Sequence, residues 1–180
     1  MIGIIGAMEE EVAALKEAME IEEVKEIAGM SFCQGKLCGK PAVVVRSGVG
    51  KVNAGICAQI LVDAFEADVL INTGIAGSLD ARLDIGDIVI SEDAVHHDMD
   101  ATIFGDPAGW VPRMDTLAFP ADKELVEKAK EANEAANPDI HTFVGRVASG
   151  DQFIASSEAK DRIADTFHAL CTEMEGAGIA

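Results

Sequence analysis

The sequence has few basic residues, few aromatic residues and no long apolar run. Its 180 residues include 14 Lys and Arg against 32 Asp and Glu, which gives a formal net charge of -18 and a pI of about 4.4. A surface this acidic repels phosphate backbones and acidic lipid headgroups, so neither a nucleic acid nor a membrane is expected as a partner. A small neutral or cationic ligand suits this charge better.

Several familiar motifs are also missing. No GxxxxGK[ST] sequence occurs, and the loop from Gly48 to Asn53 carries asparagine where a dinucleotide fingerprint has its third glycine. This loop is therefore interpreted as a tight strand-to-helix turn. The consecutive His96 and His97 would face opposite sides of a strand, and no metal site or cofactor is expected.

The cysteines and the amino-terminal residues indicate the cellular compartment. The four cysteines form no CxxC pair, so free thiols in a reducing environment are expected. The run from Met1 to Ala7 lacks a basic start and is too short to cross a bilayer. A cytoplasmic protein is expected.

Apolar periodicity predicts a single α/β domain over residues 1–180. Apolar residues make up 49% of the chain, aromatics only 4%, and there are 17 glycines, as in a compact core of Val, Ile, Leu and Ala. Strands alternate with helices, which indicates a mostly parallel or mixed sheet with helices on both sides. We expect strands at 2–7, 68–73, 87–96, 142–149 and 169–173, an antiparallel meander at 24–46, helices at 9–19, 51–65, 122–136 and 156–167, and a long loop at 101–120.

Four segments lie at the carboxyl ends of predicted strands, where open α/β sheets collect their ligands. They are Glu11, the loop from Gly74 to Gly77, the segment from Ser149 to Phe153, and the segment from Glu173 to Glu175. Glu9 and Glu10 are interpreted as acidic residues that stabilise a helix start. We expect the four segments to converge on one pocket.

Seven segments, in this order along the chain, carry a resemblance to a known family. They are Gly6-Ala-Met-Glu-Glu-Glu11, Ser47-Gly-Val-Gly-Lys51, Asn72-Thr-Gly-Ile-Ala-Gly77, Val89 to Asp98, Phe104-Gly105, Ser149-Gly-Asp-Gln-Phe-Ile154 and Glu173-Met-Glu175. Together they resemble the motifs of 5'-methylthioadenosine/S-adenosylhomocysteine nucleosidase. The resemblance implies a three-layer nucleoside phosphorylase-like fold with a central mixed sheet flanked by helices, a homodimer, and hydrolysis of the adenine N-glycosidic bond without metal or cofactor.

The resemblance also implies roles for individual residues. Glu11 would orient and deprotonate the attacking water, and Phe153 would stack on adenine while the backbone of Phe153 and Ile154 binds its edge. Met174 would pack against the ribose, and Glu175 would accept hydrogen bonds from its hydroxyls. The other implied binding positions are Val49, Ile75, Ala76, Gly77, Ala101, Phe104 and Glu173, together with Pro112 of the partner subunit.

Three departures from the family pattern bear on activity. Ile75 stands where several relatives carry a serine near the catalytic water, and Asp106 stands where some carry a tyrosine at the dimer contact. The family continues past the position of Ala180 through a further strand and helix, which include its general-acid aspartate. We therefore expect the 180 residues to be incomplete at the carboxyl end and inactive or impaired.

Two alternative functions remain open. A non-catalytic module that binds adenosine-type nucleosides would bind without turnover. A purine nucleoside phosphorylase would release adenine only with phosphate, but no clear phosphate-binding basic residues stand in matching positions.

Overall fold

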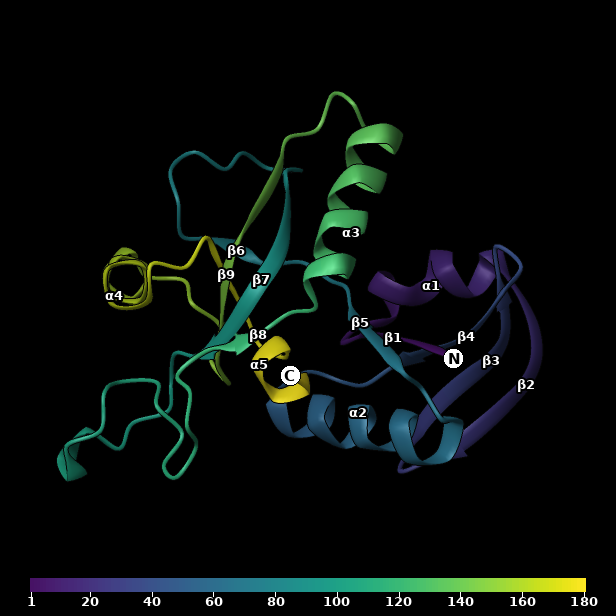
Figure 1. Cartoon of the computed structure of the whole chain (residues 1–180), viewed down its shortest axis with the longest axis horizontal. Coiled ribbons are helices and arrows are strands. Elements are labelled where there is room, and N and C mark those ends of the chain that lie inside the picture. Colours follow the sequence, from purple (N-terminus) through teal and green to yellow (C-terminus); the bar gives the residue numbers. More distant parts are fainter. The chain divides into compact units, whose positions relative to one another are not determined.

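The computed structural model describes residues 1–180, which form two compact units (Figure 1). Unit 1 comprises Met1–Ile75 with Ile179, and unit 2 comprises Ala76–Gly178 with Ala180. Each unit contains a mixed β-sheet with helices packed on it, so the predicted α/β class is confirmed. The strands pair as two five-stranded sheets, where the sequence predicted one central sheet. The single domain over residues 1–180 stays a prediction.

The sheet of unit 1 has the strand order β2-β3-β4-β1-β5. β1 pairs in parallel with β4 and with β5, whereas β2, β3 and β4 form the predicted antiparallel meander. The elements of unit 1 are β1 (Ile2–Gly6), α1 (Glu9–Ala18), β2 (Met19–Ile27), β3 (Met30–Leu37), β4 (Lys40–Arg46), α2 (Lys51–Phe65) and β5 (Val69–Asn72).

A helix covers each face of the unit 1 sheet, because successive residues of β1 point to opposite sides. Ile5 packs with Leu61 and Phe65 of α2 in one apolar cluster. Ile4 packs with Val12 of α1 in another. Unit 1 therefore has the three layers that the resemblance implied, with β1 between two apolar cores.

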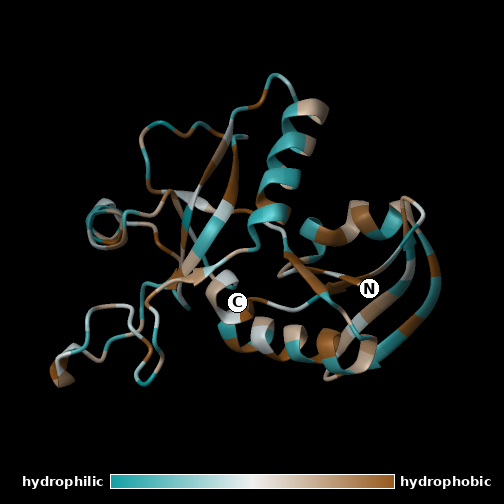
Figure 2. Ribbon diagram, viewed as in Figure 1, coloured by the Kyte–Doolittle hydropathy of each residue, from teal (hydrophilic) through white to brown (hydrophobic).

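The sheet of unit 2 has the strand order β6-β10-β9-β7-β8, with β7, β9 and β10 parallel. α4 buries Ile163 and Phe167 against this sheet. α3 contacts β7 and β9, contains no buried residue and is hydrophilic along most of its length (Figure 2). The elements are β6 (Gly77–Ser78), β7 (Ile88–His96), η1 (Thr102–Phe104), β8 (Phe119–Pro120), α3 (Lys123–Ala136), β9 (Thr142–Ser149), α4 (Ser157–Phe167), β10 (Cys171–Glu173) and α5 (Gly176–Ile179).

An ion pair ties three elements of unit 2 together. The guanidinium of Arg146 on β9 donates to both carboxylate oxygens of Asp93 on β7, at 2.7 and 2.8 Å. It also donates to the backbone oxygen of Phe167 at the end of α4, at 3.1 Å. The hydrogen bond with Asp93 raises the pKa of Arg146, so the guanidinium stays charged and links β7, β9 and α4.

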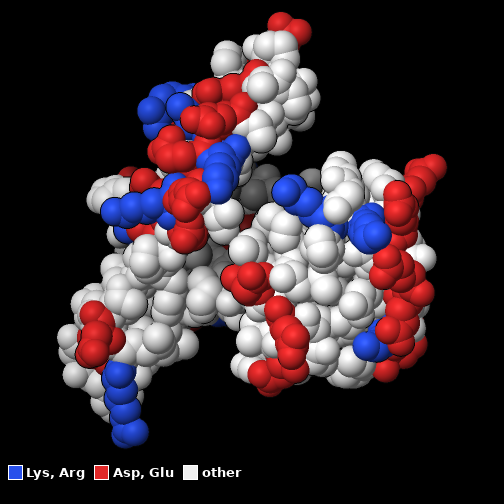
Figure 3. Space-filling view, turned by 45° about the vertical axis from the view of Figure 1, so that its right-hand side comes forward, with Lys and Arg blue, Asp and Glu red and all other residues white.

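On the face drawn in Figure 3, Asp and Glu cover more of the surface than Lys and Arg, as the composition predicts. β2, an edge strand of its sheet, carries four glutamates among its nine residues, and charge on an edge strand opposes pairing with another chain. None of the helices combines the length and apolar character that crossing a bilayer requires.

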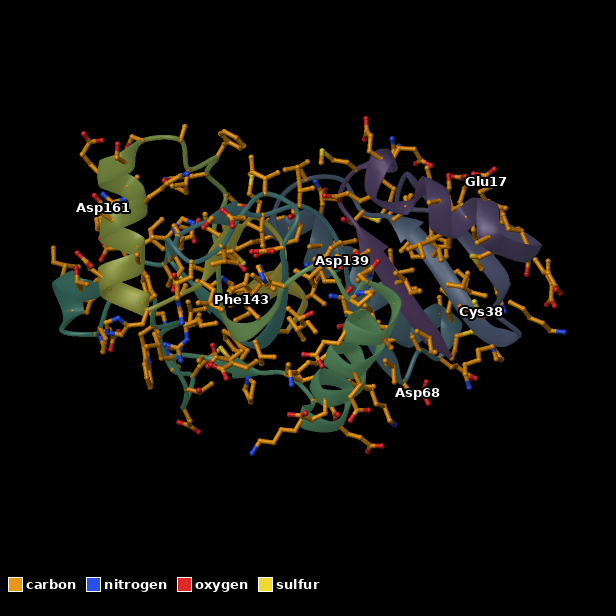
Figure 4. All side chains as sticks on the ribbon, turned by 90° about the horizontal axis from the view of Figure 1, so that it is seen from above. Glu17, Cys38, Asp68, Asp139, Phe143 and Asp161 are labelled. Atoms are coloured by element: carbon orange, nitrogen blue, oxygen red, sulfur yellow. The ribbon has the colours of Figure 1, made fainter.

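The four cysteines differ in their expected reactivity. Cys33, Cys57 and Cys171 are buried, whereas Cys38 is exposed at the turn between β3 and β4 (Figure 4). Burial raises the pKa of Cys57 and of Cys171 to about 12, with a further contribution from the charge of Glu173 at Cys171. At about pH 8 these two thiols therefore stay protonated and unreactive.

We expect a disulfide reagent such as dithionitrobenzoate to modify Cys38 alone in the native protein and all four thiols after denaturation. Thiolate release at 412 nm would measure both reactions. A Cys38→Ser variant should lose the native signal. Rapid native labelling of Cys57 or Cys171 would contradict the burial described above.

Candidate functional site

Backbone hydrogen bonds fix the carboxylate of Glu11 at the junction between β1 and α1. β1 ends at Gly6, Met8 is the N-cap of α1, and Glu11 is the third residue of that helix. Its Oε2 accepts hydrogen bonds from the backbone N–H groups of Ala7 and Met8, at 2.7 and 2.9 Å. The acidic side chain therefore caps its own helix, where its charge also complements the helix dipole.

A second strand end completes the environment of Glu11. The loop after β5 brings the backbone N–H of Ile75 to 3.1 Å from Oε1 of Glu11. The preceding Gly74 lies so close that a Cβ there would meet this oxygen at 2.5 Å. Two predicted site residues, Glu11 and Ile75, are thus brought together. Gly74 belongs to the predicted loop, but its close approach to the Glu11 carboxylate was not predicted from the sequence. The side chain of Ile75 is itself 76% exposed.

The glycine loop before α2 borders a cavity of about 530 Å³ in unit 1. Gly48 and Gly50 have φ of 85° and 100°, which only glycine adopts without strain, and the amide of Asn53 donates to the backbone oxygen of Val49 at 2.7 Å. The loop is thus the tight strand-to-helix turn predicted from the sequence. The cavity is lined by Ala7, Met8, Glu9, Glu10, Ala28, Gly29, Met30, Arg46, Ser47, Gly48, Val49 and Asn53, so it includes the predicted Val49 and two of the residues that hold Glu11.

In unit 2 the predicted ribose-binding segment forms the turn between β10 and α5. Glu173 ends β10, and Glu175 is the N-cap of α5 and is 8% exposed. The carboxylate of Glu173 accepts the backbone N–H groups of Glu175 and Gly176, at 2.9 and 2.7 Å. It also accepts a hydrogen bond from Ser149 Oγ. Met174, between the two glutamates, is half-buried.

The predicted adenine-binding residues follow β9, on a segment joined to the end of β7. The carboxylate of Asp98 accepts the backbone N–H of Asp151 at 2.8 Å. Phe153 is 87% exposed, so its ring is available for stacking, whereas Ile154 packs against the cluster formed by β7, β9 and α4.

The other predicted positions of unit 2 differ in exposure. Gly77 lies in β6 and pairs with Thr172 of β10. Thr172 precedes Glu175 by three residues. Ala101 is buried at the N-cap of η1, whereas Phe104 at the end of η1 is 86% exposed. Ala76 and Pro112 are also exposed.

The titratable side chains of the structure form no group of three or more His, Cys, Asp or Glu that could hold a metal ion.

A second cavity, of about 380 Å³, lies in unit 2 and contains none of the predicted site residues. It is lined by His97, Asp98, Met99, Asp100, Thr102, Ala108, Gln152, Arg162, Ile163, Thr166 and Phe167.

Comparison with known proteins gives consistent results. The family model of the phosphorylase superfamily matches residues 1–180. The whole chain is 43% identical to a 5'-methylthioadenosine/S-adenosylhomocysteine nucleosidase of Staphylococcus aureus (strain JH9) and covers 78% of that protein. The solved structure of such a nucleosidase from Neisseria meningitidis, in complex with methylthio-immucillin-A, matches with a TM-score of 0.95 at 39% identity, over 99% of this chain and 77% of that one. A futalosine hydrolase of Helicobacter pylori strain 26695 matches with a TM-score of 0.92 at 33% identity, over 99% of this chain and 76% of that one.

Proposed function

Because the chain belongs to the phosphorylase superfamily, and within it to the 5'-methylthioadenosine/S-adenosylhomocysteine nucleosidases, we propose that it hydrolyses the adenine N-glycosidic bond of these two nucleosides. The products are adenine and the corresponding thioribose. The family resemblance carried by the seven sequence motifs is confirmed by the identity over the whole chain.

The observation that carries the proposal is the position of Glu11. Its carboxylate accepts hydrogen bonds from backbone N–H groups that follow two parallel strands, β1 and β5. Glu11 itself lies in the first turn of α1. Cleavage of the glycosidic bond develops positive charge on the ribose, and a fixed carboxylate beside the sugar stabilises that charge. The same carboxylate would orient a water toward the anomeric carbon and take up its proton.

In this proposal the family resemblance assigns the contacts with the rest of the nucleoside to other residues of the chain. Phe153 stacks on adenine, and the backbone of Phe153 and Ile154 binds the edge of the base. Met174 packs against the ribose, and Glu175 accepts hydrogen bonds from its hydroxyls. Exposure of the Phe153 ring supports the stacking role. The contacts assigned to Val49, Ile75, Ala76, Gly77, Ala101 and Phe104 are part of the same proposal.

Adenine release from 5'-methylthioadenosine tests the proposal, and its dependence on phosphate separates hydrolysis from phosphorolysis. We expect release at the same rate with and without added phosphate, because water is the proposed nucleophile. The readout is the ultraviolet difference between nucleoside and free adenine, with S-adenosylhomocysteine as a second substrate. Release that requires phosphate would make the protein a phosphorylase, and binding without release would make it a nucleoside-binding module.

Futalosine is the third compound for this assay, because the chain is also 33% identical to a futalosine hydrolase. Preferential cleavage of futalosine would move the proposal to that substrate. The expectation that the 180 residues are inactive or impaired stays a prediction, which the same assay addresses.

We also propose that the protein is a cytoplasmic homodimer. One face of α2 supports the dimer, because Val52 is 71% exposed and Ile56, one turn later, is 44% exposed. A second copy that covers this face would remove both apolar side chains from water. In such a dimer Pro112 of the partner subunit would border the sulfur end of the substrate. The three buried thiols support a reducing compartment.

A further inference from the structure

Ser149 and Glu173 form a hydrogen-bonded pair at the ends of two neighbouring strands, in which Ser149 is buried and Glu173 is partly exposed. β9 and β10 run in parallel with Ser149 opposite Glu173, so the two side chains leave the sheet on the same side. Ser149 Oγ donates to Oε1 of Glu173 and accepts the backbone N–H of Ala177 at 2.8 Å. Ser149 has no exposed surface. Its hydroxyl thus joins the end of β9 to the beginning of α5.

The carboxylate of Glu173 is directed into the turn that follows it. Oε1 accepts from Ser149, and Oε2 accepts from the N–H groups of Glu175 and Gly176. A carboxylate has about four acceptor positions, so these internal bonds occupy most of its capacity. A direct contact of Glu173 with substrate would have to compete with them.

We propose that Ser149 and Glu173 are positioning residues, which hold the turn at Met174 and Glu175 so that the Glu175 carboxylate faces the ribose hydroxyls. This inference rests on the proposed nucleosidase function. It gives Glu173 a different role from the substrate contact that the family resemblance implied.

The turn depends on these bonds because the first N–H groups of any α-helix have no acceptor within the helix and need partners outside it. Ser149 and Glu173 supply those partners to Glu175, Gly176 and Ala177. Without the pair, Glu175 would keep its side chain but lose the fixed backbone that aims it.

The test compares binding of two non-hydrolysable adenosine analogues, one with both ribose hydroxyls and one without them. The wild-type protein should bind the first more tightly in calorimetry. Ser149→Ala and Glu173→Gln should each weaken the hydroxyl-bearing analogue about 10- to 100-fold and leave the dideoxy analogue nearly unchanged. Because both residues act through one turn, the double variant should be no worse than the weaker-binding single variant.

Ser31→Ala is the matched control, because Ser31 also donates its hydroxyl to a glutamate, Glu26, but on the exposed surface of β3. It should leave both affinities unchanged. Thermal unfolding of every variant would separate a general loss of structure from the specific effect. If Ser149→Ala does not fold, Glu173→Gln carries the comparison, since it keeps the size of the side chain and one acceptor oxygen.

Three results would overturn the inference, and they are distinguishable. Variants that keep the wild-type preference for the hydroxyl-bearing analogue would remove the positioning role and leave the proposed function intact. A wild-type protein that binds both analogues equally would remove the ribose contact of Glu175, and with it this part of the proposed function. Equal weakening of both analogues would show a merely structural role.

Discussion

Replacement of Glu11 with glutamine is expected to lower the rate of adenine release about 10²- to 10⁴-fold, the usual contribution of a general base. The amide cannot accept a proton from water, and it provides no negative charge beside the developing positive charge of the ribose. Single-turnover release of adenine would measure the loss. Calorimetry with a non-hydrolysable nucleoside should show affinity within about tenfold of the parent, because the base and ribose contacts remain.

The geometry around Glu11 makes glutamine an informative substitution. Its single amide oxygen can still accept from Ala7 and Met8, and only the bond from Ile75 is lost. That bond is exposed, so water can replace it at a small cost in stability. A Glu11→Gln variant with an unchanged unfolding midpoint and unchanged turnover would remove Glu11 from the chemistry. The helix cap would then be its whole role.

The strands and helices with clear periodicity were predictable from the sequence. The structure places α2 at Lys51–Phe65 and β9 at Thr142–Ser149, with the expected bounds, and α4 at Ser157–Phe167, one residue after its expected start. β6 and β8 were missed because a strand of two residues has no periodicity and is defined only by its partners, β10 and β7.

Met19 shows how pairing overrides local pattern. The helix expected at 9–19 included Met19 as its last residue, and this assignment is wrong. The helix ends at Ala18, and Met19 begins β2 opposite Leu37 of β3. Its side chain still packs in the same apolar cluster as Val12. The apolar spacing therefore indicated correctly that Met19 is buried, but it assigned Met19 to a helix instead of a strand.

The sequence indicated which residues belong to the candidate site, but it did not indicate the hydrogen bonds that hold them in place. Glu11 could be selected because it follows a glycine-bounded strand, and Glu173 to Glu175 because they end another. The bond from Ser149 to Glu173 joins residues 24 positions apart, and no local pattern encodes it. The only sequence signal was that both lie at predicted strand ends, where parallel neighbours would meet.

Replacement of Gly74 with alanine is expected to lower turnover about 10²-fold without any change to an ionisable group. Gly74 does not adopt a positive φ, so alanine is compatible with the backbone there. The added Cβ would lie 2.5 Å from Oε1 and 2.9 Å from Cδ of Glu11, and the carboxylate must move away. Misplacement of a catalytic group by about 1 Å typically costs this factor, and single-turnover adenine release would measure it.

A double-mutant cycle identifies the cause of this loss. If Gly74→Ala acts by displacing the Glu11 carboxylate, it should have little further effect in a Glu11→Gln background, where the proton acceptor is already absent. Independent losses that multiply would instead point to a changed path of the loop that carries Ile75. The catalytic role of Glu11 and the need for glycine at position 74 are therefore one hypothesis, because the carboxylate can act as a base only where that missing Cβ leaves room for it.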